Sequence, residues 1–351
     1  MNKIILGVLI LVLLVCGCTT LPFNLSNPFA ASGPTVKELP PDILSIQNVN
    51  TIPTPPVHPN DQFSVSFEVK NQEENRMVNN VNYELFDTGL CDWIGGEPND
   101  MKNTFTGGFA PQETKLVDWT FQAPNIDKIA HLSTTCPIRF KISYDFAALS
   151  QIDVDVISQQ RLWDLQRAGN QTTYTPTLNA GRGPIKVYFD FGTTLPVRAN
   201  STLPVYLIVM DKGTGLYSSI ENNTFIIKFP DGFTVSADSC DHFNCGADSM
   251  VNLCSKLFGK AESGNGYVSL CDVIVDGKID AKDISYIALN NNSYTNYCVN
   301  SEPIIVIKRN SPQIRCSVKT PDVPIEKTYF ISAGIYYTYD VEGESSVDVN
   351  P

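Results

Sequence analysis

The chain has 351 residues and a formal net charge of −12, with 42% hydrophobic and 18% charged residues. An acidic chain that has no cluster of Lys and Arg is repelled by phosphate backbones, which excludes nucleic acid as a partner. The hydrophobic content is sufficient for a packed core, and the length suits two or three domains better than a single sandwich.

Residues 1–18 are typical of an export signal. One Lys precedes an apolar run from Ile4 to Cys16, which is shorter than the roughly 20 residues that a bilayer span needs. The ending Val15-Cys16-Gly17-Cys18 resembles a lipobox, which implies a surface lipoprotein with its lipid on Cys18. The alternatives are an uncleaved anchor helix or cleavage elsewhere with secretion. All three place the chain after residue 18 outside the cytoplasm, and the first two attach it to the membrane.

Ten cysteines are present, and two of them fall in the signal region. An even number of remaining cysteines in an exported chain favours disulfides over zinc. These eight are Cys91, Cys136, Cys240, Cys245, Cys254, Cys271, Cys298 and Cys316. We expect Cys91 to pair with Cys136, while the pairing of the other six stays open.

Acceptor triplets for N-glycans mark candidate surface loops, because a glycan cannot be buried. They begin at Asn24, Asn170, Asn200, Asn222 and Asn291. If the host has the machinery, the protein is a glycoprotein.

Residues 19–41 contain repeated Pro and Gly and show no apolar period, which predicts a flexible tether. Residues 42–157 then alternate apolar and polar side chains in short runs. The runs are Phe63–Val69, Val117–Phe121, Ile138–Phe146 and Ile152–Val156. A period of two residues gives each strand one buried and one wet face. Short strands joined by turns predict an antiparallel sandwich.

Residues 158–183 interrupt this alternation. We predict a short helix at Gln159–Arg167, with Leu162 and Leu165 on one side, followed by a linker rich in Gly and Pro. A domain boundary is therefore expected here.

The second body, residues 184–351, repeats the first. Leu203–Val209 matches Phe63–Val69, and Asn200 stands where Asn60 stands in the first copy. The closing strands of the two bodies also match. The second body is longer, and we place the additional residues at about 233–302 as a cysteine-rich insertion at one end of a sandwich.

These patterns resemble the immunoglobulin-like modules of archaeal and bacterial cell-surface proteins, of the cell-adhesion-related type found in bacteria. The resemblance implies an all-β fold with two immunoglobulin-like antiparallel β-sandwiches in tandem, the second carrying a disulfide-rich insertion. It also implies a structural, adhesive or binding role rather than chemistry.

One segment of the insertion could bind Ca²⁺. Counted from Asp272, oxygen donors fall at positions that calcium loops use, with Gly277 at the sharp bend. The candidate ligands are Asp272, Asp276, Lys278 through its carbonyl, Asp280 and Asp283. The segment is similar to one calcium loop of a dockerin, but Ile274 replaces a ligand and no second loop is found. The alternative is a metal-free hairpin that turns at Asp276-Gly277. No other cofactor is expected.

Catalytic motifs are absent from the sequence, so we expect a non-catalytic protein. Trp93 lies in a predicted loop beside Cys91, where it could contact a ligand or pack over the disulfide. The sequence therefore predicts a membrane-anchored extracellular protein that binds envelope glycan or a surface protein. A carbohydrate-binding lipoprotein that uses Trp93, an envelope-processing hydrolase and a fibre subunit are the alternatives.

Overall fold

The computed structural model describes residues 34–39, 41–169, 174–217, 219–246 and 296–351. Within these ranges every regular element is a strand except helix α2 (Gln159–Arg167), so the predicted all-β class is confirmed. The described residues all belong to one compact unit. In this part of the chain, no helix is long and apolar enough to cross a membrane.

The first sandwich has a four-stranded sheet in the order β2–β3–β7–β5. These strands are β2 (Leu44–Ile52), β3 (Gln62–Asn71), β7 (Thr114–Gln122) and β5 (Asp92–Glu97). The facing layer consists of β4 (Asn82–Asp87), β6 (Lys102–Thr104) and parts of β8 (Thr134–Ile157) and β19 (Glu326–Val349). The layers meet where Phe67 of β3 stacks on Phe140 of β8 at 3.9 Å between ring centroids, with Trp119 edge-on to both.

The second sandwich has a three-stranded sheet in the order β10–β12–β18. These strands are β10 (Ile185–Phe191), β12 (Thr202–Asp211) and β18 (Ile314–Lys319). Its other layer continues the sheet of β8 and β19. The strands added there are β1 (Thr35–Glu38), β9 (Thr177–Ala180), β11 (Val197–Arg198), β14 (Phe225–Lys228), β15 (Phe243–Cys245) and β16 (Tyr297–Asn300). A separate pair joins β13 (Ser219–Ile220) to β17 (Ile304–Ile305).

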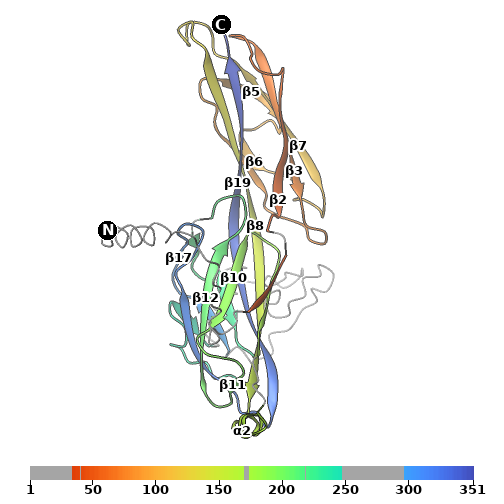
Figure 1. Ribbon diagram of the computed structural model, residues 1–351. Helices are drawn as coiled ribbons and strands as arrows, with labels where there is room; N and C mark the ends of the chain where they lie inside the picture. Colours follow the sequence, from red (N-terminus) through yellow and green to blue (C-terminus); the bar gives the residue numbers. More distant parts are fainter. Residues whose placement is uncertain (1–33, 40, 170–173, 218, 247–295) are drawn as a thin grey trace, which may run out of the picture. The chain divides into compact units, whose positions relative to one another are not determined.

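The two sandwiches share strands β8 and β19, which pair antiparallel along their whole lengths of 24 residues (Figure 1). The first half of β8 and the second half of β19 close the first sandwich, and the other halves belong to the second. The strand pairing thus differs from the expected division into 42–157 and 184–351, because the chain end at 337–349 completes the first sandwich. The sequence resemblance of the closing strands does not reveal that the end of the chain belongs to the first sandwich.

The continuity of β8 has a simple cause. The segment between the expected strands Ile138–Phe146 and Ile152–Val156 contains no Gly or Pro, and its side chains keep alternating between the faces. In β19, Gly343 lies opposite Phe140, and a Cβ atom there would come within 2.4 Å of the Phe140 ring. The glycine therefore makes room for a core ring and does not end the strand.

Two segments predicted to be irregular contain regular elements. Within the expected tether 19–41, residues 35–38 form β1, which pairs in parallel with β9. Within the expected linker 158–183, α2 has the predicted bounds, and β9 then joins the edge of β8. Helix α2 is capped at its N-terminus by Ser158, whose hydroxyl accepts a hydrogen bond from the Arg161 N–H, and the helix buries Leu165.

The expected repeat is visible in the fold. Strands β3 and β12 have the same burial pattern, and Val65 and Val205 are both fully buried. Asn60 and Asn200 both have positive φ, 64° and 55°, in the turns that precede these strands. Asn is one of the residues that adopt this conformation most readily, which explains its use at both places.

Candidate functional site

Several of the expected site residues lie outside the described residues. These are Cys18, Cys254, Cys271, Asn24, Asn170, Asn291 and the whole candidate calcium loop with Asp272, Asp276, Lys278, Asp280 and Asp283. Two of the acceptor asparagines are described: Asn200 and Asn222 are both exposed in turns, as a glycan requires.

Trp93 does not lie in a loop. It belongs to strand β5, pairs with Phe121 of β7, and is partly buried against the hydrophobic core. Its indole N–H is buried. Of the three tryptophans, all of which are described, Trp163 on α2 is the most exposed, at 48%.

A groove of about 580 Å³ lies beside the place where β8 passes from one sandwich to the other. Its lining comes from β1 and its end (Lys37, Leu39), the loop after β3 (Glu73, Asn75, Arg76), the outward face of β8 (Ala147, Leu149, Gln151) and the end of β9 (Asn179, Ala180, Gly181, Arg182). We call it the junction groove.

One wall of the junction groove is the loop 71–76, which is fixed from beneath by Asn71. The Asn71 side chain is fully buried and donates to the carbonyl oxygens of Arg76, Phe109 and Ala110 at 3.0, 3.2 and 2.9 Å. Its oxygen accepts the Glu73 N–H at 2.9 Å. Because these bonds satisfy the loop backbone internally, the wall is pre-organised.

Arg76 and Glu73 form a two-bond ion pair on this wall. The guanidinium donates to the two carboxylate oxygens at 3.3 and 3.0 Å and lies 4.3 Å from the ring centroid of Phe146. The Glu73 side chain is only 5% exposed. Bidentate pairing and the ring contact together fix the orientation of the guanidinium.

Arg182 connects the opposite wall to the same loop. It donates to the Gln72 carbonyl at 2.8 Å and lies 3.4 Å from the Glu74 carboxylate. Lys186 is buried and donates to the carbonyl oxygens of Leu39 and Gly181, so it ties the end of β1 to the end of β9. Both walls therefore depend on backbone carbonyls held by cationic side chains.

This arrangement suits binding rather than bond breaking. The floor contributes the small or apolar side chains of Ala147 and Leu149, and the exposed amides of Asn75 and Asn179 stand at the rim. Ligand sites commonly combine an apolar floor with a few orienting polar groups. Among the residues that line the groove, the one carboxylate is Glu73, and Arg76 already engages it.

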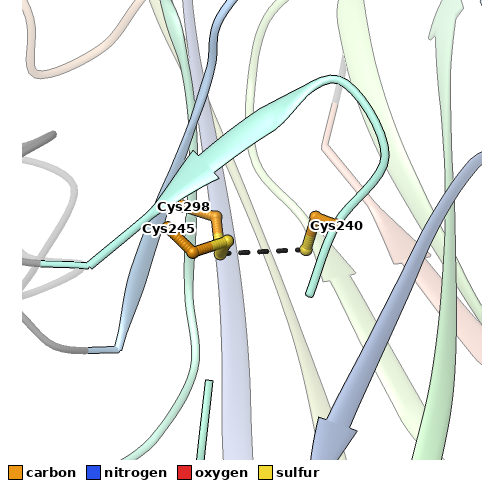
Figure 2. Close-up of side chains that lie close together, drawn as sticks. All are labelled: Cys240, Cys245 and Cys298. Carbon is orange, nitrogen blue, oxygen red and sulfur yellow. Dashed lines mark hydrogen bonds between the residues drawn. A yellow bond between two sulfur atoms is a disulfide. The ribbon is translucent and has the colours of Figure 1, made fainter. Parts of the chain in front are cut away.

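The second chemical cluster is formed by cystines. The expected Cys91–Cys136 bridge is present, and the open pairings resolve in part to Cys240–Cys316 and Cys245–Cys298. Figure 2 shows Cys240 against the Cys245–Cys298 bridge, with 3.8 Å between the sulfurs of Cys240 and Cys298. Both sulfurs belong to disulfides, so neither carries a proton or the thiolate charge that a metal ligand needs.

The junction groove could not be found from the sequence. Its residues come from four segments that are joined by the continuity of β8 and by the parallel pairing of β1 with β9. One local signal was present: Asn71 ends the alternating strand β3, and Asp211 ends its counterpart β12. A polar residue at the same place in both copies indicates a turn that this side chain stabilises.

No protein-family model and no curated protein matches the chain. Among solved structures, the collagen adhesin of S. aureus is 11% identical, covers 90% of this chain and 97% of that chain, and has a TM-score of 0.18. The B domain of a biofilm-associated protein is 4% identical over 90% and 87%, with a TM-score of 0.13. A variant of the E. coli CFA/I adhesin CfaE is 9% identical over 92% and 99%, with a TM-score of 0.11. TM-scores this low do not establish a common fold, so the architecture is defined by the strand pairing of this chain.

Proposed function

We propose that this chain is a non-catalytic protein of the cell surface that binds a ligand of the envelope, a glycan or a surface protein, in the junction groove. The observation that carries the proposal is the groove itself. Its walls are held by Asn71, the Arg76–Glu73 pair and Arg182, while the amides at its rim are exposed to solvent.

The cell-surface location is supported by the sequence. The export signal and the lipobox-like Cys18 are expected at the start of the chain, and three disulfides among the described residues fit an oxidising compartment. We propose attachment to the membrane through a lipid on Cys18, with an anchor helix as the alternative.

A hydrolase would need two free carboxyl groups on opposite sides of a scissile bond. In the junction groove, Glu73 is paired with Arg76, and the nearby Glu74 lies beside Arg182. The chemistry of the lining therefore favours recognition.

Calcium is a separate proposal for residues 272–283. Calorimetric titration of the whole oxidised protein with CaCl₂ should give binding that both Asp276→Ala and Asp283→Ala abolish. If the variants give the same heats as the wild type, these residues are not calcium ligands and Asp276-Gly277 is a metal-free turn.

For the carbohydrate-binding alternative, we propose Trp163 in place of Trp93 as the residue that contacts the sugar. Trp93 packs against the core, whereas Trp163 on α2 exposes nearly half of its surface. The amide of Gln160 lies three residues before Trp163 on the same helix. An exposed indole stacks well on a sugar ring. If α2 is the sugar platform, Trp163→Ala abolishes binding to envelope polysaccharide and Ala147→Trp does not.

The test of the main proposal uses cells that display the full chain. Adhesion is measured to immobilised envelope polysaccharide and, separately, to immobilised envelope protein. Ala147→Trp puts a large ring on the floor of the groove and should weaken adhesion at least about tenfold, a change of roughly 1.4 kcal/mol.

Ser143→Trp is the matched control, because Ser143 lies on the same strand and the same face outside the groove lining. It should adhere like the wild type. Equal adhesion of the Ala147→Trp and wild-type cells, at equal surface display, would remove the groove from the function.

A further inference from the structure

Two disulfides of the second sandwich lie in contact. Cys240–Cys316 joins the segment before β15 to β18, and Cys245–Cys298 joins directly paired residues of β15 and β16. The sulfurs of Cys240, Cys245 and Cys298 all lie within 4.8 Å of one another, and the Cys240 and Cys298 sulfurs are 3.8 Å apart (Figure 2). This places a sulfur of one bridge next to a sulfur of the other.

The four cysteines differ in their access to solvent. Cys240, Cys298 and Cys316 are 4%, 0% and 0% exposed, whereas residue Cys245 is partly exposed although its sulfur is buried. Cys245 also ends the three-residue strand β15, which among the described residues is the last strand on one side of its sheet. Short edge strands open more easily than central ones, so local opening of β15 exposes the Cys245 sulfur to a thiol from solvent before the other sulfurs of the cluster.

We infer that the Cys245–Cys298 bridge is a modification site for small thiols, and that its opening is passed on to the Cys240–Cys316 bridge. In the first step, the thiolate of a small thiol forms a bond to the Cys245 sulfur. The Cys245–Cys298 bond breaks, and its electron pair leaves on the Cys298 sulfur.

In the second step, the Cys298 thiolate attacks the Cys240 sulfur beside it. A Cys240–Cys298 bond forms, the Cys240–Cys316 bond breaks, and Cys316 leaves as a thiolate that takes a proton from water. One small thiol has been bound as a mixed disulfide on Cys245 and one protein thiol has been released, so no net oxidation or reduction occurs.

The exchange changes which sheets are joined. Cys316 belongs to the three-stranded sheet, whereas Cys298 belongs to the sheet that contains β15. Cys240 itself lies opposite Cys316 in an antiparallel bridge, so the present bond joins neighbouring segments of one layer. Moving the bond of Cys240 from Cys316 to Cys298 therefore replaces a link within this layer by a link between the two layers.

The direct test uses the wild-type protein and reduced glutathione at about pH 8, where thiolates are available. Free thiols are blocked with N-ethylmaleimide, and the bridges are mapped by mass spectrometry of proteolytic peptides. We expect glutathione on Cys245, a new Cys240–Cys298 peptide and a blocked Cys316. The Cys91–Cys136 bridge, which is remote from the cluster in sequence, serves as the internal control.

Two variants approach the same product from opposite sides. Cys316→Ser frees Cys240 beside the Cys245–Cys298 bridge, and Cys245→Ser frees Cys298 beside the Cys240–Cys316 bridge. Both should give Cys240–Cys298, so that the maleimide labels Cys245 in the first variant and Cys316 in the second. Cys136→Ser is the control, in which the label gained relative to the wild type should fall on Cys91.

The inference is overturned if Cys316→Ser carries its label on Cys240 and retains the Cys245–Cys298 bridge. It is equally overturned if wild-type protein with glutathione on Cys245 keeps Cys240–Cys316 intact. Should either variant fail to fold, the wild-type map decides the matter alone.

Discussion

Asn71 and Asp211 occupy the same place in the two copies of the repeat, at the last residue of β3 and of β12. Each is buried, and each accepts the N–H of the residue two positions later, from Glu73 at 2.9 Å and from Gly213 at 3.0 Å. This local bond stabilises the turn that follows the strand. In the first sandwich that turn became a wall of the junction groove.

Asn71→Ala should therefore destabilise the protein more than a typical surface change. The substitution removes a buried side chain that bonds three carbonyls and one N–H around the loop, which we expect to lower the free energy of unfolding by about 3 kcal/mol. Urea denaturation followed by tryptophan fluorescence measures it. Asn103→Ala, at an exposed position, should change the value by less than about 0.5 kcal/mol. Equal effects of the two variants would refute the role given to Asn71.

Asp211 has a different electrostatic environment. Burial raises the pKa of its carboxyl above the ordinary value, although it accepts the Tyr339 hydroxyl at 2.9 Å and the Arg309 guanidinium lies 3.8 Å away. The folded state therefore keeps the Asp211 proton to higher pH than the unfolded state does. Its contribution to stability is largest below the pKa of a free carboxyl and falls as pH rises through the raised pKa.

Asp211→Asn removes this titration and leaves an oxygen to accept the Tyr339 hydroxyl and the Gly213 N–H. We expect the stability of the variant, relative to the wild type, to increase as pH rises from about 3.5 to 7. Urea unfolding at both pH values measures the difference. A difference that is constant or that decreases with pH would contradict the assigned direction.

At the scale of elements, the predictable features were those that depend on local pattern. The strand Phe63–Val69, its repeat Leu203–Val209 and the helix at Gln159–Arg167 follow from the spacing of apolar residues, and the structure confirms them. The continuity of β8 and β19 and the pairing of β1 with β9 were missed. They depend on partners that are distant in sequence, which a local pattern does not specify.

Gly343 illustrates this dependence. In sequence it is a typical strand breaker, yet in β19 it lies opposite Phe140, which is fully buried between Phe67 and Trp119. Gly343→Ala should cost about 2 kcal/mol of unfolding free energy, because its Cβ would come within 2.4 Å of the ring. In a Phe140→Leu background the cost should fall below about 1 kcal/mol. If the costs are the same in both backgrounds, the ring contact is not the cause.

At the scale of the whole molecule, the shared strands join the sandwiches into one folding unit. Each sandwich obtains part of a layer from β8 and part from β19, so neither is complete without residues from both strands. The hydrophobic core is correspondingly continuous through the described residues of both sandwiches.

We therefore expect a single cooperative unfolding transition in calorimetry, with equal calorimetric and van't Hoff enthalpies. Val65→Ala and Val205→Ala, at equivalent fully buried positions of β3 and β12, should each lower the stability of the whole transition by about 2 kcal/mol. Two resolved transitions, each shifted by one of the variants, would show that the sandwiches unfold independently.

The central claim is that the pre-organised junction groove is the recognition surface. Hydrogen exchange with mass spectrometry, on the full chain with and without purified envelope polysaccharide or envelope protein, tests it most directly. The account predicts slower exchange in the presence of one of these ligands at residues 71–76 and 179–182, the two walls of the groove. Slower exchange confined to other segments, such as α2, or no change with either ligand, would contradict it.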